Sequence, residues 1–408
     1  MELKLITGAT TFEACVNTIK QIDPSNLGIT NLVVVPDSFS MQAESLIFDI
    51  LNIKSTINIE VVGISRLASK ILRNNNIKYN RISGLEEVFC LFKVVKENEG
   101  KFQYFHKCGV DFCKKILQII KQFKACKINP EQIKSVGDEL LDKKMADLKL
   151  IYEQYNNQLA DKLDLSGLLD FFIENASQTL DLTKIKLFFV NFDSFSLEIN
   201  SFICKLSKLV NSVFIGMARP ISPNNSFIYE DDILKKTSQL AKENGIFLQV
   251  ENSATNLKDQ HLIMAKNLFG FNIELSKNDW FLNVVAKNKQ DEVEFVAKYI
   301  KRKVFEGNRF KDFAIAVANE KYLDVVKTCF SKYNIATYCD DANDLSQTIL
   351  GRFVFKMIEI AKLGFDMQSL KYLVNFPFKD IVQREEILTQ IFYYNIESEN
   401  EFLDRFSE

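Results

Sequence analysis

The loop after the first predicted strand lies where a phosphate-binding loop would lie, but it lacks the residues that bind a nucleotide. A Walker A loop reads Gly-x-x-x-x-Gly-Lys-Ser/Thr, in which the lysine contacts the β- and γ-phosphates and the hydroxyl binds magnesium. Counted from Gly8, the last three positions of this pattern hold Glu13, Ala14 and Cys15. The sequence therefore predicts neither ATP nor Mg²⁺ as a cofactor of this chain.

The start of the next helix carries a capping signal instead. Thr10-x-x-Glu13 has the spacing of a capping box, with Thr10 as the N-cap and Glu13 folding back onto the free amides. A carboxylate there occupies the positive end of the helix, which would otherwise attract a phosphate. We therefore expect Gly8, Thr10 and Thr11 to be the remnant of a nucleotide site that stays empty.

Two further patterns fall short of metal-dependent chemistry. Asp37 after a proline is typical of a metal-dependent nuclease, but the Glu-x-Lys that should follow is missing, because Glu60 is followed by two valines. A turn that ends a strand explains the Pro-Asp pair more simply. His106, Cys108 and Cys113 cluster in sequence, yet they fall short of the four ligands of a zinc site. With two histidines in the whole chain, the sequence predicts no catalytic residue and no metal ligand.

A cationic run between residues 107 and 127 is the clearest local charge signal. It holds six lysines against a single acid, Asp111. A solvated helix face and contact with nucleic-acid phosphates explain such a run equally well. If DNA binds here, we expect contacts from Lys114, Lys115 and Lys121. A second basic run, at residues 298–303, is better explained as the polar face of an amphipathic helix.

The elements that must position these residues alternate between short apolar strands and helices. Strand patterns occur at residues 4–6, 32–35, 57–64, 186–190, 212–216 and 247–250. Helical periodicity separates them at residues 12–22, 65–73, 198–209 and 231–244. Strand, tight loop, helix and strand at this spacing predict an α/β domain that opens with the βαβ unit of a P-loop nucleotide-binding fold.

Two regions differ from this alternation. Between residues 85 and 173 the sequence predicts long amphipathic helices at 85–97, 111–126, 130–141, 145–163 and 165–175, with no convincing strand. This pattern indicates an all-α insertion. After a boundary at residues 276–279, strands at 282–286 and 312–317 with helices at 291–306 and 320–333 predict a second βαβ start. The tail from residue 347 reads as helical.

Composition limits the class of protein. The 408 residues are enough for two or three domains. A formal net charge of −2 is too small to attract nucleic acid or a membrane to the protein as a whole. Eight scattered cysteines without a signal peptide indicate reduced thiols in a cytosol. No apolar run approaches the length of a membrane span. We therefore predict a cytoplasmic protein with no membrane partner.

Five segments resemble, in the right order, the B subunits of the AddAB (RexAB) helicase–nuclease. They are residues 35–44, 63–72, 188–195, 292–300 and 310–316. The first is similar to the family's segment after the first helix, and the second to its Phe-Ser-Arg-Leu-Ala helix start. The third resembles the family's degenerate second helicase motif. Each motif alone is weak, but the ordered set covers nearly the whole chain.

This resemblance implies a fold and an arrangement of domains. The fold is a P-loop NTPase-like superfamily 1 helicase core, a parallel sheet with a helical insertion followed by the start of a second α/β domain. Residues 1–80 and 181–279 would form the first motor-like domain (1A-like), and 81–180 the insertion (1B-like). Residues 280–346 would start the second motor-like domain (2A-like), and 347–408 a further helical segment (2B-like).

The resemblance also implies partners and candidate contacts. The partners would be DNA, chiefly single-stranded or frayed at its ends, and an ATP-driven AddA/RexA-type subunit in a heterodimer. Arg66 would lie on the face that meets single-stranded DNA. Ser38, Ser40 and Gln42 would offer polar contacts from the loop before the next helix.

The chain also departs from the family pattern. Where the family has Asp-Gly in the second motif, this chain has Asn191 and Phe192, and Asp193 comes two residues late. The missing Walker lysine matches the Rex type. The family's nuclease domain and iron–sulphur cysteines lie farther downstream, so we expect only the N-terminal, motor-like half here, as a truncated gene or a split subunit.

Three functions follow from these patterns. The first is a catalytically silent, helicase-like DNA-binding scaffold of a recombination and double-strand-break repair helicase–nuclease. The second is a divergent nucleotide hydrolase, which the absent lysine and carboxylate disfavour. The third is a protein-interaction module that keeps the fold and binds neither ligand.

Overall fold

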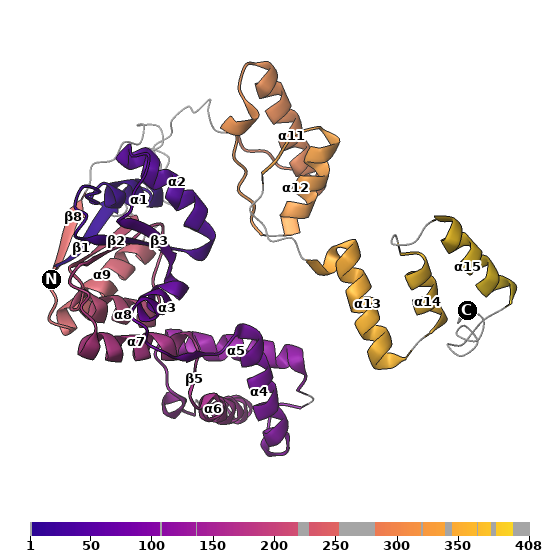
Figure 1. Ribbon diagram of the computed structural model, residues 1–408, viewed down its shortest axis with the longest axis horizontal. Helices are drawn as coiled ribbons and strands as arrows, with labels where there is room; N and C mark the ends of the chain where they lie inside the picture. Colours follow the sequence, from indigo (N-terminus) through magenta and orange to yellow (C-terminus); the bar gives the residue numbers. More distant parts are fainter. Residues whose placement is uncertain are drawn as a thin grey trace. The chain divides into compact units, whose positions relative to one another are not determined.

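The computed structural model describes residues 2–106, 108–135, 137–218, 228–252, 282–319, 321–338, 345–364, 366–376 and 381–394 (Figure 1). The chain divides into two compact units, Met1–Ser276 and Lys277–Glu408. This division falls at the boundary predicted for residues 276–279, although those residues lie outside the described ranges.

A six-stranded parallel sheet forms the centre of the first unit. Its order is β3-β2-β6-β7-β1-β8, and every pair of neighbours is parallel. The strands are β1 (Glu2–Gly8), β2 (Thr30–Val35), β3 (Ile59–Gly63), β6 (Ile185–Phe189), β7 (Ser212–Ala218) and β8 (Leu248–Asn252). Because helices cover both faces of a parallel sheet, its strands read as continuous apolar runs. The predicted α/β class with a parallel sheet is therefore confirmed.

Helices cover the two faces of this sheet (Figure 1). On one face, α1 (Thr11–Ile19) and α2 (Ser40–Leu51) bury residues such as Cys15 and Ile47 against Val33. The other face is covered by α3 (Ile64–Asn74), α7 (Leu165–Thr179), α8 (Leu197–Ser207) and α9 (Ile228–Glu243). Val33 and Val34 are fully buried in different cores, as the alternation of side chains along a strand requires.

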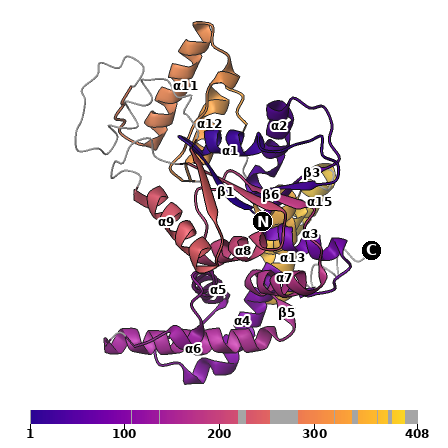
Figure 2. The same cartoon turned by 90° about the vertical axis from the view of Figure 1, so that its left-hand side faces the viewer.

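The predicted helical insertion forms a lobe with a core of its own. It consists of α4 (Gly84–Asn98), α5 (Val110–Ala125) and α6 (Glu139–Leu159), and it extends from the sheet on the side of α7 (Figure 2). Buried Asp147 stabilises the segment between α4 and α5 by accepting backbone N–H bonds from Gln103, Tyr104 and Phe105 at 2.8–3.1 Å.

Two predictions for the insertion are wrong. The expected helix at 130–141 is only a short 3₁₀ turn at Pro130–Gln132, because Gly137 has a left-handed φ of 92° and Asp138 caps a new helix at Glu139. A strand pair was also missed, since β4 (Asn80–Arg81) pairs with β5 (Lys162–Leu163) where the chain enters and leaves the lobe. Two-residue strands are too short to show a period in sequence.

The second unit contains helices but no strand within its described ranges. Its helices are α11 (Lys289–Phe305), α12 (Lys321–Lys332), α13 (Ile349–Leu363), α14 (Met367–Val374) and α15 (Ile381–Tyr393). The predicted helices at 291–306 and 320–333 are confirmed as α11 and α12, which share a small core. The strands predicted at 282–286 and 312–317 are not formed there. A strand needs a neighbour for its amides and carbonyls, and apolar alternation alone does not supply one.

Candidate functional site

The carboxyl ends of the six strands meet at one edge of the sheet, because all the strands are parallel. In open α/β sheets, ligands bind in the crevice outside these ends. The loops after β1, β2, β3 and β6 all open at this edge. They contain the Gly8 remnant, the predicted DNA contacts and the degenerate second motif.

The N-cap predicted at Thr10 is confirmed, and Glu13 folds back as expected, although its carboxylate accepts from the Ala9 amide and not from that of Thr10, as a strict capping box would require. The Glu13 amide donates to Thr10 Oγ1 at 3.1 Å, and the Ala9 amide donates to Glu13 Oε2 at 3.0 Å. Gly8 allows this tight turn, since a Cβ at that position would lie 2.4 Å from the Ala14 backbone nitrogen. The protein thus places its own carboxylate at the positive end of α1, where a nucleotide phosphate would otherwise bind.

The two positions that would carry the lysine and the hydroxyl contribute to the core instead. Ala14 is fully buried, and Cys15 is 1% exposed. Burial raises the pKa of the Cys15 thiol to about 11, so it stays protonated at neutral pH. Neither side chain reaches the edge of the sheet.

A second acid lies beside the remnant loop. The hydroxyl of Thr11 donates to Asp193 Oδ1 at 3.3 Å, across 182 positions of sequence. Asn191, two residues after the end of β6, adopts a left-handed φ of 62° that asparagine tolerates, and the chain turns there toward Thr11. Sequence alone showed Asp193 only as a misplaced motif residue, because nothing local indicates that it meets Thr11.

The predicted DNA contacts that follow β2 and β3 lie in the 3₁₀ segment at residues 37–39 and in the first turns of α2 and α3. We define the edge patch as residues 37–42 with Ser65 and Arg66. Ser65 Oγ donates to Asp37 Oδ2 at 2.8 Å and so joins the start of α3 to the segment after β2. Arg66, Ser38 and Gln42 are exposed within this patch.

One detail of the prediction is corrected. Ser40 and Gln42 lie in the first turn of α2, not in a loop before it, because the chain turns through a 3₁₀ segment at residues 37–39 directly into that helix. Ser40 is half-buried, and its hydroxyl donates to the Asp37 carbonyl at 3.2 Å.

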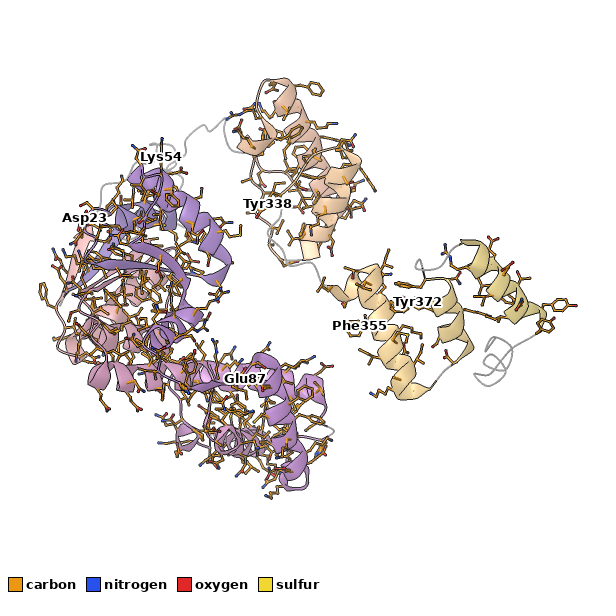
Figure 3. All side chains as sticks on the ribbon, in the orientation of Figure 1. Asp23, Lys54, Glu87, Tyr338, Phe355 and Tyr372 are labelled. Carbon is orange, nitrogen blue, oxygen red and sulfur yellow. The ribbon has the colours of Figure 1, made fainter. Side chains whose placement is uncertain are left out.

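The lysine run belongs to α5 in the insertion, and several of its charges already have protein partners. Lys121 lies 2.5 Å from Glu87, and the Glu87 side chain is 6% exposed. Figure 3 labels Glu87 on the insertion. Lys114 pairs with exposed Asp111 at 3.0 Å. Lys115 is exposed, and Lys107 lies outside the described residues. Lys121 therefore forms an ion pair with a buried acid, which neither the solvated-face nor the DNA-contact interpretation of the run predicted. Contact of these lysines with DNA stays a prediction.

The second basic run has the local pairing expected of a helix face. Lys298 pairs with Glu294 at 2.7 Å, and Lys303 pairs with Glu306 at 2.6 Å. The four side chains are partly or largely exposed, and each pair joins residues three or four positions apart, as on a solvated helix surface.

The two thiols of the predicted cluster share one buried core. Cys108 and Cys113 are buried in the core of the insertion, whereas His106 is exposed. In the ranges that the structure describes, no three His, Cys, Asp or Glu side chains gather to hold a metal ion. In the same ranges, no helix has the length and apolar character needed to cross a membrane.

Comparison with known proteins shows what the chain is similar to. A family model described as ADDB, N-terminal, matches residues 7–268. The B subunit of an ATP-dependent helicase/deoxyribonuclease from Clostridium perfringens (strain ATCC 13124) is 27% identical over 91% of this chain. The protein of the same name from Clostridium botulinum (strain Langeland) is 24% identical, also over 91% of this chain. The chain covers 35% of the length of each of these curated relatives.

Proposed function

Since the chain belongs to the ADDB N-terminal family, we propose that it is a catalytically silent, helicase-like scaffold that holds DNA within a recombination and double-strand-break repair helicase–nuclease. Its ligand would be single-stranded DNA or a frayed end, bound at the edge patch. Its partner would be an AddA/RexA-type subunit that supplies ATP-driven movement.

The observation that carries this proposal is the carboxylate of Glu13 at the N-terminus of α1. Phosphoryl transfer depends almost entirely on positive groups and metal ions around the transferring phosphate. This loop has Ala14 in place of the lysine, and Glu13 and Asp193 add negative charge on either side of Thr11. A nucleotide phosphate would be repelled where a motor ATPase must attract it.

The edge patch supports DNA binding. An exposed guanidinium at Arg66, in the same patch as the exposed side chains of Ser38 and Gln42, suits phosphate contacts without base readout. Such contacts give an affinity that falls steeply with salt, because each neutralised phosphate releases counterions. Lys114 and Lys115 on the insertion are candidates for further phosphate contacts.

The domain arrangement of a superfamily 1 core belongs to the same proposal. The α/β sheet of residues 1–80 and 181–279 would be 1A-like, and the lobe of α4–α6 would be 1B-like. The 2A-like and 2B-like segments would start at residues 280 and 347. The P-loop class is supported by strand β1, the turn at Gly8 and helix α1 following in that order.

Salt-dependent DNA binding tests the scaffold directly. Fluorescence anisotropy with a labelled oligothymidylate should show weak binding whose log–log slope against salt falls by about one unit in Arg66→Glu. Arg73→Glu is the matched control, because Arg73 is exposed in the last turn of the same helix and the change in net charge is identical. Lys114→Glu with Lys115→Glu should flatten the slope further if the insertion contacts DNA.

Two outcomes would overturn the proposal. Equal slopes for the wild type, Arg66→Glu and Arg73→Glu would remove the edge patch as a DNA site. Magnesium-dependent ATP turnover that single-stranded DNA stimulates, and that a change at Gly8 abolishes, would show that the loop is an active motor site. The partner is tested by co-expression with the AddA/RexA-type subunit, and separate elution at low salt would count against the heterodimer.

A further inference from the structure

A polar pocket of about 450 Å³ lies at the root of the insertion, where α5 and α6 meet α7 and α8. All four helices belong to the first unit. The volume lies within the range of about 300–1,000 Å³ that small-ligand sites have. None of the pocket's lining residues belongs to the edge patch or to the remnant loop, so it is a separate feature of the surface.

Four lysines line this pocket, and one of them, Lys124 in α5, is paired with Asp164. Lys127 follows α5, Lys162 is in β5, and Lys205 is in α8. Lys127 donates to the hydroxyl of Ser201 at 2.5 Å, and Lys205 lies one helical turn after Ser201. Lys162 has only a distant pairing with Glu86 at 3.9 Å, between two partly exposed side chains. Within the described part of the chain, neither Lys127 nor Lys205 forms an ion pair.

Two of the pocket's three acids are engaged with lining residues other than Lys127 and Lys205. Asp164 pairs with Lys124 at 2.5 Å, and both side chains are nearly buried. Glu198 accepts a hydrogen bond from the Ser166 hydroxyl, and burial raises the pKa of its carboxyl group. Asp170 is exposed on α7. The cations around Ser201 are therefore not neutralised at short range by the acids that share the pocket.

We propose that this pocket binds a phosphate group, held by the ammonium groups of Lys127 and Lys205 and by the hydroxyl of Ser201. Each ammonium has three donors and acts as a compact point charge, which suits a tetrahedral dianion that accepts from several directions. The bound phosphate would connect the end of α5 in the insertion to α8 beneath the sheet, and so hold the lobe against the α/β domain. The inference does not depend on the DNA-scaffold function.

Calorimetric titration of the full chain with sodium pyrophosphate tests the site. We expect saturable binding in the wild type and an affinity about tenfold or more lower in Lys127→Gln/Lys205→Gln, since each charge-assisted contact contributes substantially. Lys93→Gln/Lys184→Gln is the matched control, because both lysines are exposed in the same unit and neither lines the pocket. The control should bind like the wild type.

A second measurement keeps the test independent of how the variants fold. Acetylation of the native protein, followed by mass spectrometry, should show Lys127 and Lys205 protected by pyrophosphate, with Lys93 modified equally in its presence and absence. The proposal is overturned if sodium chloride at equal ionic strength protects these lysines equally. It is also overturned if the double variant and the wild type bind pyrophosphate with the same affinity.

The source of the phosphate is decided by competition. If an oligothymidylate displaces pyrophosphate and protects Lys127 and Lys205, the pocket binds a DNA phosphodiester. If pyrophosphate binds with unchanged affinity while DNA is bound, the pocket takes a free phosphate compound. Both results support a phosphate site and differ only in which molecule carries the phosphate.

Discussion

Replacing Lys121 by glutamine should destabilise the packing of α4 against α5, whatever its effect on DNA. Lys121 Nζ lies 2.5 Å from Glu87 Oε2, and the two side chains are 51% and 6% exposed. Without the lysine, the Glu87 carboxylate is left buried beside the hydrophobic core of the insertion and the fully buried ring of Tyr155. Removing one partner of a buried ion pair is costly, because the remaining charge is uncompensated.

The size of the effect follows from the distance and the exposure. Two unit charges 2.5 Å apart attract by about 1.7 kcal/mol at the dielectric constant of water and by about 6.6 kcal/mol at an effective value of about 20. The half-exposed lysine lies nearer the first limit, and ordering its side chain costs up to about 2 kcal/mol. We therefore expect a coupling free energy of about 1.5–3 kcal/mol between Lys121 and Glu87.

A double-mutant cycle measures this coupling. Hydrogen exchange of the α4 and α5 amides, read by mass spectrometry, gives the local free energy of opening for the wild type, Lys121→Gln, Glu87→Gln and the double variant. Lys114→Gln serves as the control, because its pair with Asp111 is exposed and should contribute about 0.5 kcal/mol or less. A Lys121–Glu87 coupling free energy no larger than the contribution of the Lys114–Asp111 pair would refute this reasoning. Lys121 would then behave as a freely solvated cation.

Three further predictions test other parts of the first unit. Gly8→Ala should lower the free energy of unfolding by about 2–3 kcal/mol, because the added Cβ would lie 2.4 Å from a backbone nitrogen. Gly63→Ala should cost only about 1 kcal/mol, because its Cβ would meet the movable carboxylate of Asp37. Equal urea midpoints for the two variants would contradict this. Native thiol titration at mildly alkaline pH should modify exposed Cys126 rapidly and leave Cys15 unmodified, because burial raises the pKa of Cys15 to about 11; Cys126→Ser should remove the fast phase. Burial raises the carboxyl pKa of Glu198 above its ordinary value of 4.5, so the folded state binds more protons than the unfolded state above that pH. The free energy of unfolding should then fall as pH rises from about 4.5 through the folded-state pKa, and Glu198→Gln should reduce this slope in urea titrations.

The sequence by itself determined those features that depend on neighbours along the chain. The strands around Leu32 and Val213 were predictable, because a buried parallel strand must be apolar on both faces. The N-cap at Thr10 and the return of the Glu13 carboxylate to this turn were predictable because they are local, since the two bonds span three and four residues. The missing lysine and the negative group at the start of α1 are therefore evident from the order of residues alone.

Tertiary structure decided which distant residues meet. The pairing of Thr11 with Asp193 spans 182 residues, and that of Lys121 with Glu87 spans 34. Strand order sets the first pairing and helix packing sets the second, and neither leaves a periodic signal in sequence. The same reason explains why the strands predicted at 282–286 and 312–317 are not formed. Apolar alternation shows only that a segment could form a strand. A strand forms when a neighbouring segment exchanges backbone hydrogen bonds with it.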